Sequence, residues 1–302
     1  MSAVSERLTI LVTGAAGPAG RALGEQVVRR AEAPGLRLVG VDLAPAEVPG
    51  FDDVLPVVGA LDPAYDLAMR ELVARIDPDL VVPTVAEELP GLAVLGAGLP
   101  AGLGRRLVLS DPGPVALAAD KLLTMWTLAE RGVAVPRHTG LTGPGVPDAV
   151  TAWGGPVVVK PRVSRGGRGV HVVDSAADPV WQAVDATWVA QDFAPGEEFS
   201  PQVFRSPLTG RSRVVVLRKT ELKQGRVGNA ASAVRVADGA ERDVSALAVR
   251  AVEALDLVGP VDLDVRRAGD GTPVVLEVNS RFGALSAAAP ELLESVLAEW
   301  PR

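Results

Sequence analysis

The chain has 302 residues, a formal net charge of −7 and no cysteine. An acidic chain lacks the basic surface that general nucleic-acid binders usually carry, so nucleic acid is not an expected partner. The absence of cysteine excludes disulfides and thiolate zinc sites. The chain shows no basic stretch followed by an apolar run at its start, so we expect a cytoplasmic protein without a membrane partner.

The first third of the sequence alternates short apolar runs with helical segments. The runs at 8–12, 38–41 and 80–82 are predicted strands, and helices are expected from Gly20 and from Asp66. Strands that alternate with helices indicate βαβ units and a parallel sheet. We therefore expect a Rossmann-like α/β domain over residues 1–111, ending where Asp111-Pro112-Gly113-Pro114 breaks the pattern.

A glycine-rich turn, Thr13–Gly20, follows the first predicted strand and opens a helix. Such a turn lets a phosphate approach the helix N-terminus, and Asp42 at the end of the second strand has the position of a ribose ligand. This pattern is typical of NAD-dependent reductases and epimerases, which form a rival hypothesis. The Tyr-x-x-x-Lys pair of short-chain reductases is missing, because Tyr65 is followed four residues later by Met69. A tight strand-to-helix turn with a structural role is the favoured interpretation.

Lysine is rare in this arginine-rich chain, which contains only Lys121, Lys160, Lys219 and Lys223. Lys160 ends an apolar run and precedes the loop Gly166-Gly167-Arg168-Gly169, whose backbone donors are suited to phosphate. Lys121 lies in a helix expected over 115–131. No Gly-Lys-Ser/Thr occurs, so this is not a P-loop. Either lysine alone would equally suit a surface turn, but together with the loop they favour triphosphate binding.

The most specific pattern lies near the end of the sequence. Asp262 and Asp264 precede an Asp-Gly pair, and Glu277 and Asn279 follow it, all within apolar-alternating segments. Asp-Gly in this setting predicts a hairpin in which Asp264 faces Glu277 and Asp262 faces Asn279. Opposed carboxylates repel each other, and a bound Mg²⁺ or Mn²⁺ would remove that repulsion. A solvated strand face is the alternative, and Pro273 could lengthen the loop and shift the register.

In this order the motifs resemble the ATP-grasp superfamily, and specifically single-copy proteins similar to one half of the carbamoyl-phosphate synthase large subunit. The resemblance covers nearly the whole chain and rests on residues 10–20, 79–84, 120–121, 132–136, 158–169, 191–199 and 277–283. It implies a pre-ATP-grasp domain at 1–111, a small lobe with a phosphate lid at 112–190 and a large lobe with the metal-binding hairpin at 191–302. Antiparallel sheets are expected in both lobes.

The resemblance also implies a set of site residues around ATP. Lys121 and Lys160 would contact its phosphates, and a lid containing Arg165, Gly166 and Gly167 would close over them. The backbone of Gln191, Asp192, Phe193 and Ala194 would bind adenine, and Glu198 would hold the ribose. Asp264, Glu277 and Asn279 would ligate Mg²⁺ or Mn²⁺, with Asp262 close by. Arg281 would act with Lys160 in catalysis by steadying the transferred phosphate or the substrate carboxylate.

The implied activity is ATP-dependent carboxylate–amine ligation through an acyl phosphate, with release of ADP and phosphate. Small carboxylates and amines, amino acids above all, are the expected substrates, near residues 84–88 and near Arg213, Arg218 and Lys219. A non-catalytic ATP-binding relative is a further hypothesis, although such a relative would usually have lost a metal ligand. The sequence leaves open the acid, the amine, any ligand of the N-terminal glycine turn, and the oligomeric state, a homodimer included.

Overall fold

The computed structural model describes residues 7–30, 35–98, 103–142 and 152–301 of the chain. Its first domain contains a parallel sheet with the strand order β3-β2-β1-β4. The parallel α/β architecture expected from the alternating pattern is thereby confirmed. The strands are β1 (Leu8–Thr13), β2 (Leu36–Asp42), β3 (Asp53–Pro56) and β4 (Leu80–Val82); the helices are α1 (Pro18–Arg29), α2 (Tyr65–Ile76), the 3₁₀ turn η1 (Ala86–Glu88), α3 (Leu89–Gly98) and α4 (Leu103–Arg106).

Two helices lead out of this domain, where the sequence predicted a single one. They are α5 (Pro112–Ala119) and α6 (Lys121–Glu130). Asp120 separates them because it adopts an extended conformation and its carboxylate accepts hydrogen bonds from the backbone N–H groups of Leu122 and Leu123. An N-cap of this kind begins a new helix and cannot continue the previous one.

The small lobe contains an antiparallel sheet with the order β5-β8-β6-β7. Its elements are β5 (His138–Gly140), β6 (Val157–Pro161), β7 (His171–Val173), the 3₁₀ turn η2 (Pro179–Gln182) and β8 (Trp188–Asp192). The glycine-rich loop predicted as a phosphate lid connects β6 to β7. This sheet encloses a small apolar cluster of its own, which includes Val157, Val159 and Ala190.

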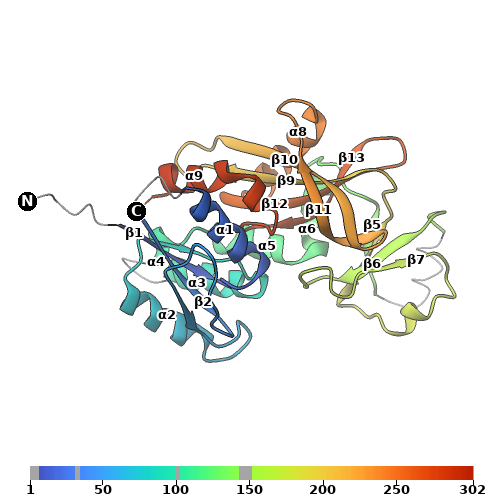
Figure 1. Ribbon diagram of the computed structural model, residues 1–302. Helices are drawn as coiled ribbons and strands as arrows, with labels where there is room; N and C mark the ends of the chain where they lie inside the picture. The colour runs from blue at the N-terminus through green and yellow to red at the C-terminus, as the bar shows by residue number, and fades with distance from the viewer. Residues whose placement is uncertain (1–6, 31–34, 99–102, 143–151, 302) are drawn as a thin grey trace, which may run out of the picture.

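The large lobe contains a five-stranded antiparallel sheet with the order β11-β10-β9-β12-β13. Its elements are β9 (Glu198–Arg205), β10 (Ser212–Gln224), β11 (Val227–Arg235), α8 (Arg242–Ala254), β12 (Gly259–Arg267), β13 (Pro273–Asn279), the 3₁₀ turn η3 (Ser286–Ala288) and α9 (Pro290–Glu299). The strands β10 and β11 form one long hairpin, longer than the two short strands that the sequence indicated (Figure 1).

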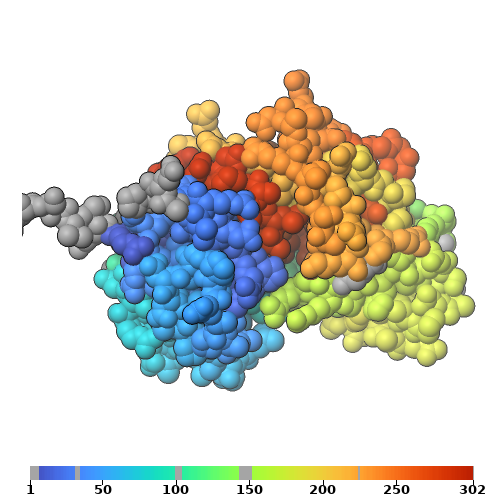
Figure 2. Space-filling view, viewed as in Figure 1, coloured from blue at the N-terminus to red at the C-terminus, as the bar shows by residue number. Residues whose placement is uncertain are grey.

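Each face of the large-lobe sheet belongs to a different hydrophobic core. On one face, Phe199 and Leu263 pack with residues of α6 and α8. On the other face, Phe204 and Leu217 pack with α9 and with β1 and β4 of the first domain. The first domain and the large lobe therefore share a core. Figure 2 shows the first domain (blue) against the C-terminal helix (red), with the small lobe (yellow-green) beside the first domain. Among the described helices, none combines the length and the apolar character that a bilayer crossing requires.

Candidate active site

A cavity of about 780 Å³ opens where the first domain and the two lobes meet. Its lining brings together residues that lie far apart in the sequence. Thirteen of the fourteen residues predicted for the site line it, namely Lys160, Arg165, Gly166, Gly167, Gln191, Asp192, Phe193, Ala194, Glu198, Asp264, Glu277, Asn279 and Arg281. Lys121 does not line the cavity, but its ammonium lies 3.5 Å from a carboxylate oxygen of Glu277.

The acidic hairpin has the predicted register at its cavity end. Asp264 pairs with Glu277 and Asp262 with Asn279. The predicted two-residue turn is wrong, however, because Arg267 pairs with Pro273 and leaves a five-residue loop, 268–272. A bulge between Asp264 and Val265 offsets the longer loop and restores the register. Bulges commonly re-aim side chains beside active sites, and this one keeps the polar residues on the cavity face.

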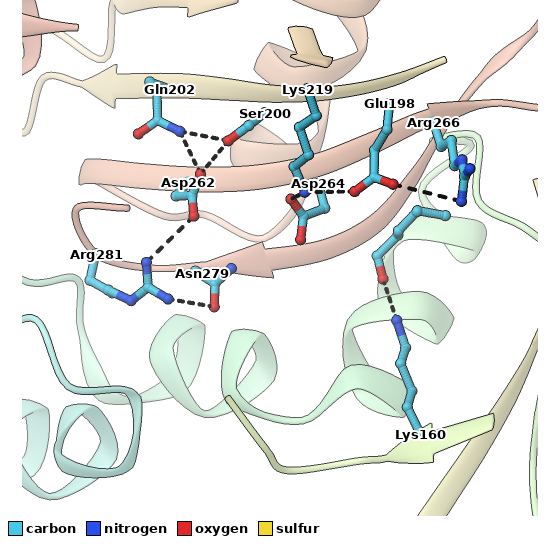
Figure 3. Close-up of polar contacts among 11 residues, drawn as sticks. Lys160, Glu198, Ser200, Gln202, Lys219, Asp262, Asp264, Arg266, Asn279 and Arg281 are labelled. Atoms are coloured by element: carbon cyan, nitrogen blue, oxygen red, sulfur yellow. Dashed lines mark hydrogen bonds and ion pairs between the residues drawn. The ribbon is translucent and has the colours of Figure 1, made fainter. Parts of the chain in front are cut away.

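Asp262 is held by donors of the protein itself. One carboxylate oxygen accepts hydrogen bonds from Ser200 Oγ, at 2.8 Å, and from the amide of Gln202, and the other lies 3.4 Å from Nη1 of Arg281 (Figure 3). Burial raises the pKa of Asp262, whereas the charge of Arg281 opposes that rise. The effect of these contacts is to fix Arg281, whose Nη2 also donates to the Asn279 side-chain oxygen at 3.2 Å.

A buried lysine bridges the predicted ribose ligand and a predicted metal ligand. The ammonium of Lys219 lies 2.6 Å from Glu198 Oε1 and 2.6 Å from Asp264 Oδ1, and Arg266 approaches the second oxygen of Glu198 at 3.7 Å (Figure 3). Burial lowers the pKa of Lys219, but the two carboxylates more than offset this effect and raise it above its usual range. The protein thus places the ammonium of Lys219 between the predicted ribose ligand Glu198 and the predicted metal ligand Asp264.

The two other site lysines point at the hairpin from the small-lobe side. Lys160 is 5% exposed, and its ammonium donates to the Leu276 carbonyl at 3.0 Å, which leaves two further N–H donors. Burial lowers the pKa of Lys160 to about 8, although the nearby carboxylate of Glu277 favours the charged form. Lys121 donates to the backbone oxygen of Ser164, at 3.0 Å, and so anchors the beginning of the lid loop.

The hinge between the lobes presents both polar and aromatic groups to the cavity. Gln191 is 2% exposed, and its amide nitrogen has no hydrogen-bond partner within the described residues. Two guanidinium groups lie over the ring of Phe193, those of Arg226 at 4.6 Å and Arg266 at 4.8 Å from its centroid. A buried donor without a partner is costly, so the amide nitrogen of Gln191 is a candidate donor to a ligand bound in the cavity.

The lid loop contacts the first domain through an ion pair between Arg165 and Glu87. Glu87 belongs to η1, which is held by its buried neighbour Glu88. The carboxylate of Glu88 accepts hydrogen bonds from the side chains of Thr13 and Tyr65 and from the backbone N–H groups of Thr84 and Val85. Burial raises the pKa of Glu88, and these donors counteract the rise. The buried carboxylate therefore fixes the segment that reaches the lid.

The donor set fits a magnesium nucleotide better than a metal held by the protein alone. Within the described part of the chain, no three His, Cys, Asp or Glu side chains form a metal-binding group. Asp264, Glu277 and Asn279 offer two carboxylates and one amide on the cavity side of a single hairpin. Mg²⁺ prefers oxygen ligands and usually completes its shell with water and substrate phosphates, which suits so incomplete a protein set.

Comparisons with known proteins decide between the hypotheses. Residues 118–285 match the family model described as an ATP-grasp domain. The chain belongs to the ATP-grasp family. A D-alanine–D-alanine ligase of Cupriavidus taiwanensis is 30% identical over 250 residues, which cover 78% of this chain and 72% of that protein. Like that relative, the chain itself is an ATP-grasp carboxylate–amine ligase that forms C–N bonds.

Solved structures share the fold of this ATP-grasp ligase. An L-amino acid ligase from Bacillus licheniformis superimposes with a TM-score of 0.71 at 21% identity and covers 98% of this chain and 72% of its own. An N5-carboxyaminoimidazole ribonucleotide synthetase from Thermotoga maritima gives a TM-score of 0.65 at 19% identity, with 90% and 68% covered. The predicted pre-ATP-grasp sheet followed by two antiparallel sheets is thereby confirmed.

The family result replaces the NAD-dependent reductase hypothesis with the ligase. The structure agrees with a conformational role for the N-terminal turn: Gly14 has φ +57°, and the Ala16 N–H donates to Asp42 at 2.9 Å. Arg213 and Arg218, expected near the substrate, do not line the cavity. Arg213 lies six residues from Lys219 along β10, about 20 Å away, and lines a separate hollow, whereas Arg218 pairs with Glu197.

Proposed function

We propose that this ligase joins the carboxylate of one amino acid to the amino group of another, with ATP and Mg²⁺ as cosubstrate and metal. The observation that carries the proposal is the position of Arg281, which lines the cavity beside the acidic hairpin. Its Nε is buried without a hydrogen-bond partner in the described structure, while its other nitrogens are fixed by Asp262 and Asn279. A guanidinium held in this way is suited to a substrate carboxylate.

The described residues suggest where the nucleotide would lie. We assign Lys160 and Lys121 to the phosphates, Arg165, Gly166 and Gly167 to the lid above them, and Gln191–Ala194 with Glu198 to the nucleoside. Asp264, Glu277 and Asn279 would hold the metal. Bound MgATP supplies the phosphoryl group that activates a carboxylate, which is otherwise a poor acylating agent. We also keep the boundaries 1–111, 112–190 and 191–302 as the proposed domain division.

The chain contributes positioning, charge and exclusion of water. Arg281 would orient the carboxylate, and Lys160 would balance negative charge in a buried setting where such an interaction is strong. The reaction needs no nucleophile from the protein, because binding both substrates in the right geometry supplies much of the rate acceleration. The Arg165–Glu87 contact would keep the lid against the first domain, so that water stays away from the activated acid until the amine attacks.

Amino acids are the substrates we favour because relatives are named for them. The D-alanine–D-alanine ligase and the L-amino acid ligase both resemble this chain over most of its length. The relation to one half of the carbamoyl-phosphate synthase large subunit, suggested by motif order, stays a proposal of lower rank, as does a cytoplasmic location. A non-catalytic relative is less favoured, since Lys160 and all three proposed metal ligands line or adjoin the same cavity.

The direct test is a panel of L- and D-amino acids, given singly and in pairs, with ATP and Mg²⁺. We expect release of ADP and phosphate together with a product whose mass equals the two amino acids minus water. Parallel titrations should show binding of MgATP and none of NADH. Tight NADH binding without ATP binding, or ATP turnover that no amino acid stimulates, would contradict the proposal.

A further inference from the structure

The first domain contributes a wall to the cavity that is largely apolar and exposed. Leu43, Val57, Val58, Ala60 and Leu61 line this wall. Leu61 is 84% exposed and Leu43 67%, and Val58 is also exposed. Large side chains left open in a cavity differ from single apolar residues on an outer surface, because a ligand in the cavity would cover them together. We call these five residues the apolar wall.

The charged first-domain residues that the structure describes in the cavity lining are all negative, and most are engaged by the protein. Among the first-domain residues that the structure describes in the cavity lining, none is lysine or arginine. Asp42 accepts a hydrogen bond from the backbone of Ala16, Glu88 is saturated by four donors, and Glu87 pairs with Arg165. A second carboxylate or a phosphate on the substrate would find no cation among these first-domain residues, because the cations of the lining, such as Arg165 and Arg168, belong to the lid and to the two lobes.

The apolar wall lines the same cavity as Arg281, the residue proposed to hold the reacting carboxylate. Leu285 lies four residues beyond Arg281, lines the same cavity and packs against the core that the first domain shares with the large lobe. With its carboxylate at Arg281, an amino acid that turns its side chain toward Leu285 and the first domain would cover the apolar wall.

We propose that the apolar wall selects the acid substrate, accepting amino acids with uncharged apolar side chains and disfavouring aspartate, glutamate and phosphorylated acids. This inference rests on the proposed function, since it assumes that Arg281 receives the carboxylate. Each methylene that is covered or left uncovered in a hydrophobic pocket changes kcat/KM by about 10-fold or more. Leucine and methionine should therefore exceed glutamate by about 100-fold or more as acid substrates.

The experiment isolates the acid position with hydroxylamine as the amine. Hydroxylamine attacks an acyl phosphate at its carbonyl carbon, forming a hydroxamate and releasing phosphate, so that hydroxamate formation reports which acid was activated. Leucine, methionine, valine, glutamate and aspartate are compared at saturating MgATP. We expect kcat/KM for leucine and methionine to exceed that for glutamate by about 100-fold.

Variants of exposed leucines connect the preference to the apolar wall. Leu61→Arg and Leu43→Arg should lower kcat/KM for leucine by about 10-fold, raise it for glutamate, and leave the KM for ATP unchanged. Leu208→Arg is the matched control, because Leu208 is 65% exposed and does not line the cavity. All three positions are exposed, so the folded state should tolerate the change.

The outcomes separate this inference from the proposed function. Hydroxamates that form equally well from glutamate and leucine would leave the ligase proposal standing and overturn the role of the apolar wall. So would a change in selectivity for Leu61→Arg no greater than that for Leu208→Arg. If no amino acid yields a hydroxamate or stimulates ADP release, the proposed function itself fails, and the inference with it.

Discussion

The ammonium of Lys219 lies 2.6 Å from Oδ1 of Asp264, a residue that we propose as a ligand of the metal. It is equally close to Glu198, and its side chain is only 5% exposed. Without a nucleotide, the cluster is thus neutralised by a cation of the protein. Removal of one partner of such a buried pair typically costs about 3–5 kcal/mol, because the other charge is left unpaired.

Lys219→Met should therefore destabilise the protein in magnesium-free buffer and make it responsive to magnesium. We expect the melting temperature to fall by roughly 5 °C or more, and Mg²⁺ to restore part of the loss by occupying the vacated position. Thermal unfolding with and without Mg²⁺ measures both effects. Lys223→Met is the control, since Lys223 lines the same cavity but is exposed. A variant as stable as the native chain, or one insensitive to Mg²⁺, would contradict this account.

Glu277→Gln and Asp264→Asn should each abolish magnesium-dependent ATP turnover and leave the fold intact. Each replacement keeps the shape of the side chain and removes one negative charge from the proposed metal site. We expect kcat to fall by about 100-fold or more, the scale seen when a preorganised electrostatic group is lost. Steady-state ADP release and circular dichroism provide the two readouts. Asp270→Asn, at the exposed tip of the same hairpin, should retain activity. Survival of turnover in both site variants would refute the metal assignment.

Lys160 should make nucleotide binding weaken at alkaline pH. Its pKa is lowered to about 8 by burial, below the ordinary value of about 10.5. Below pH 8 the ammonium is charged and ready for phosphate; above it, the free protein must take up a proton when the nucleotide binds. The Kd for MgATP should therefore be flat below pH 8 and rise about 10-fold per pH unit above it.

Calorimetric titrations at pH 7, 8, 9 and 9.5 would measure this dependence. Lys160→Arg is the appropriate control, because a guanidinium stays charged throughout this range. The Lys160→Arg variant should bind MgATP more weakly, since a planar guanidinium replaces a compact ammonium. Its Kd should no longer rise with pH above pH 8. The same slope in both proteins would assign the titration to another group.

The acidic hairpin shows how far sequence alone leads. Alternating apolar residues and the Asp-Gly pair led to the correct prediction that Asp264 faces Glu277, although the two-residue turn assumed for it is wrong. The true loop is longer, and a bulge restores the register at the cavity end. Sequence signals could not predict that compensation, because the periodicity of two is the same on either side of a bulge.

The lysine bridge and the divided helix were beyond the sequence for different reasons. Lys219 meets Glu198 and Asp264 from three different strands, so their contact depends on the strand order β10-β9-β12 and on no local pattern. Alternation along β9 and along β12 predicts which residues of each strand share a face with Glu198 or with Asp264. It does not predict that Glu198 and Asp264 project from the same face of the sheet. By contrast, Asp120 before Lys121 was a visible N-cap signal that an uninterrupted apolar pattern concealed.

The ion pair between Arg165 of the lid and Glu87 of the first domain should control how tightly ATP consumption is coupled to amide formation. Glu87→Gln or Arg165→Gln would loosen the lid, admit water to the activated acid and raise the ratio of ADP to amide product. Because the two side chains are 24% and 40% exposed, we expect an effect of about 1 kcal/mol or less, or a few-fold in that ratio.

The double variant should resemble either single variant, since both remove the same contact. Arg30→Gln, which breaks the pair between Arg30, directly after α1, and Glu294 of α9, is the control and should leave the ratio unchanged. Additive effects of the two lid changes would show that Glu87 and Arg165 act independently, and the ion pair would then have no role in coupling.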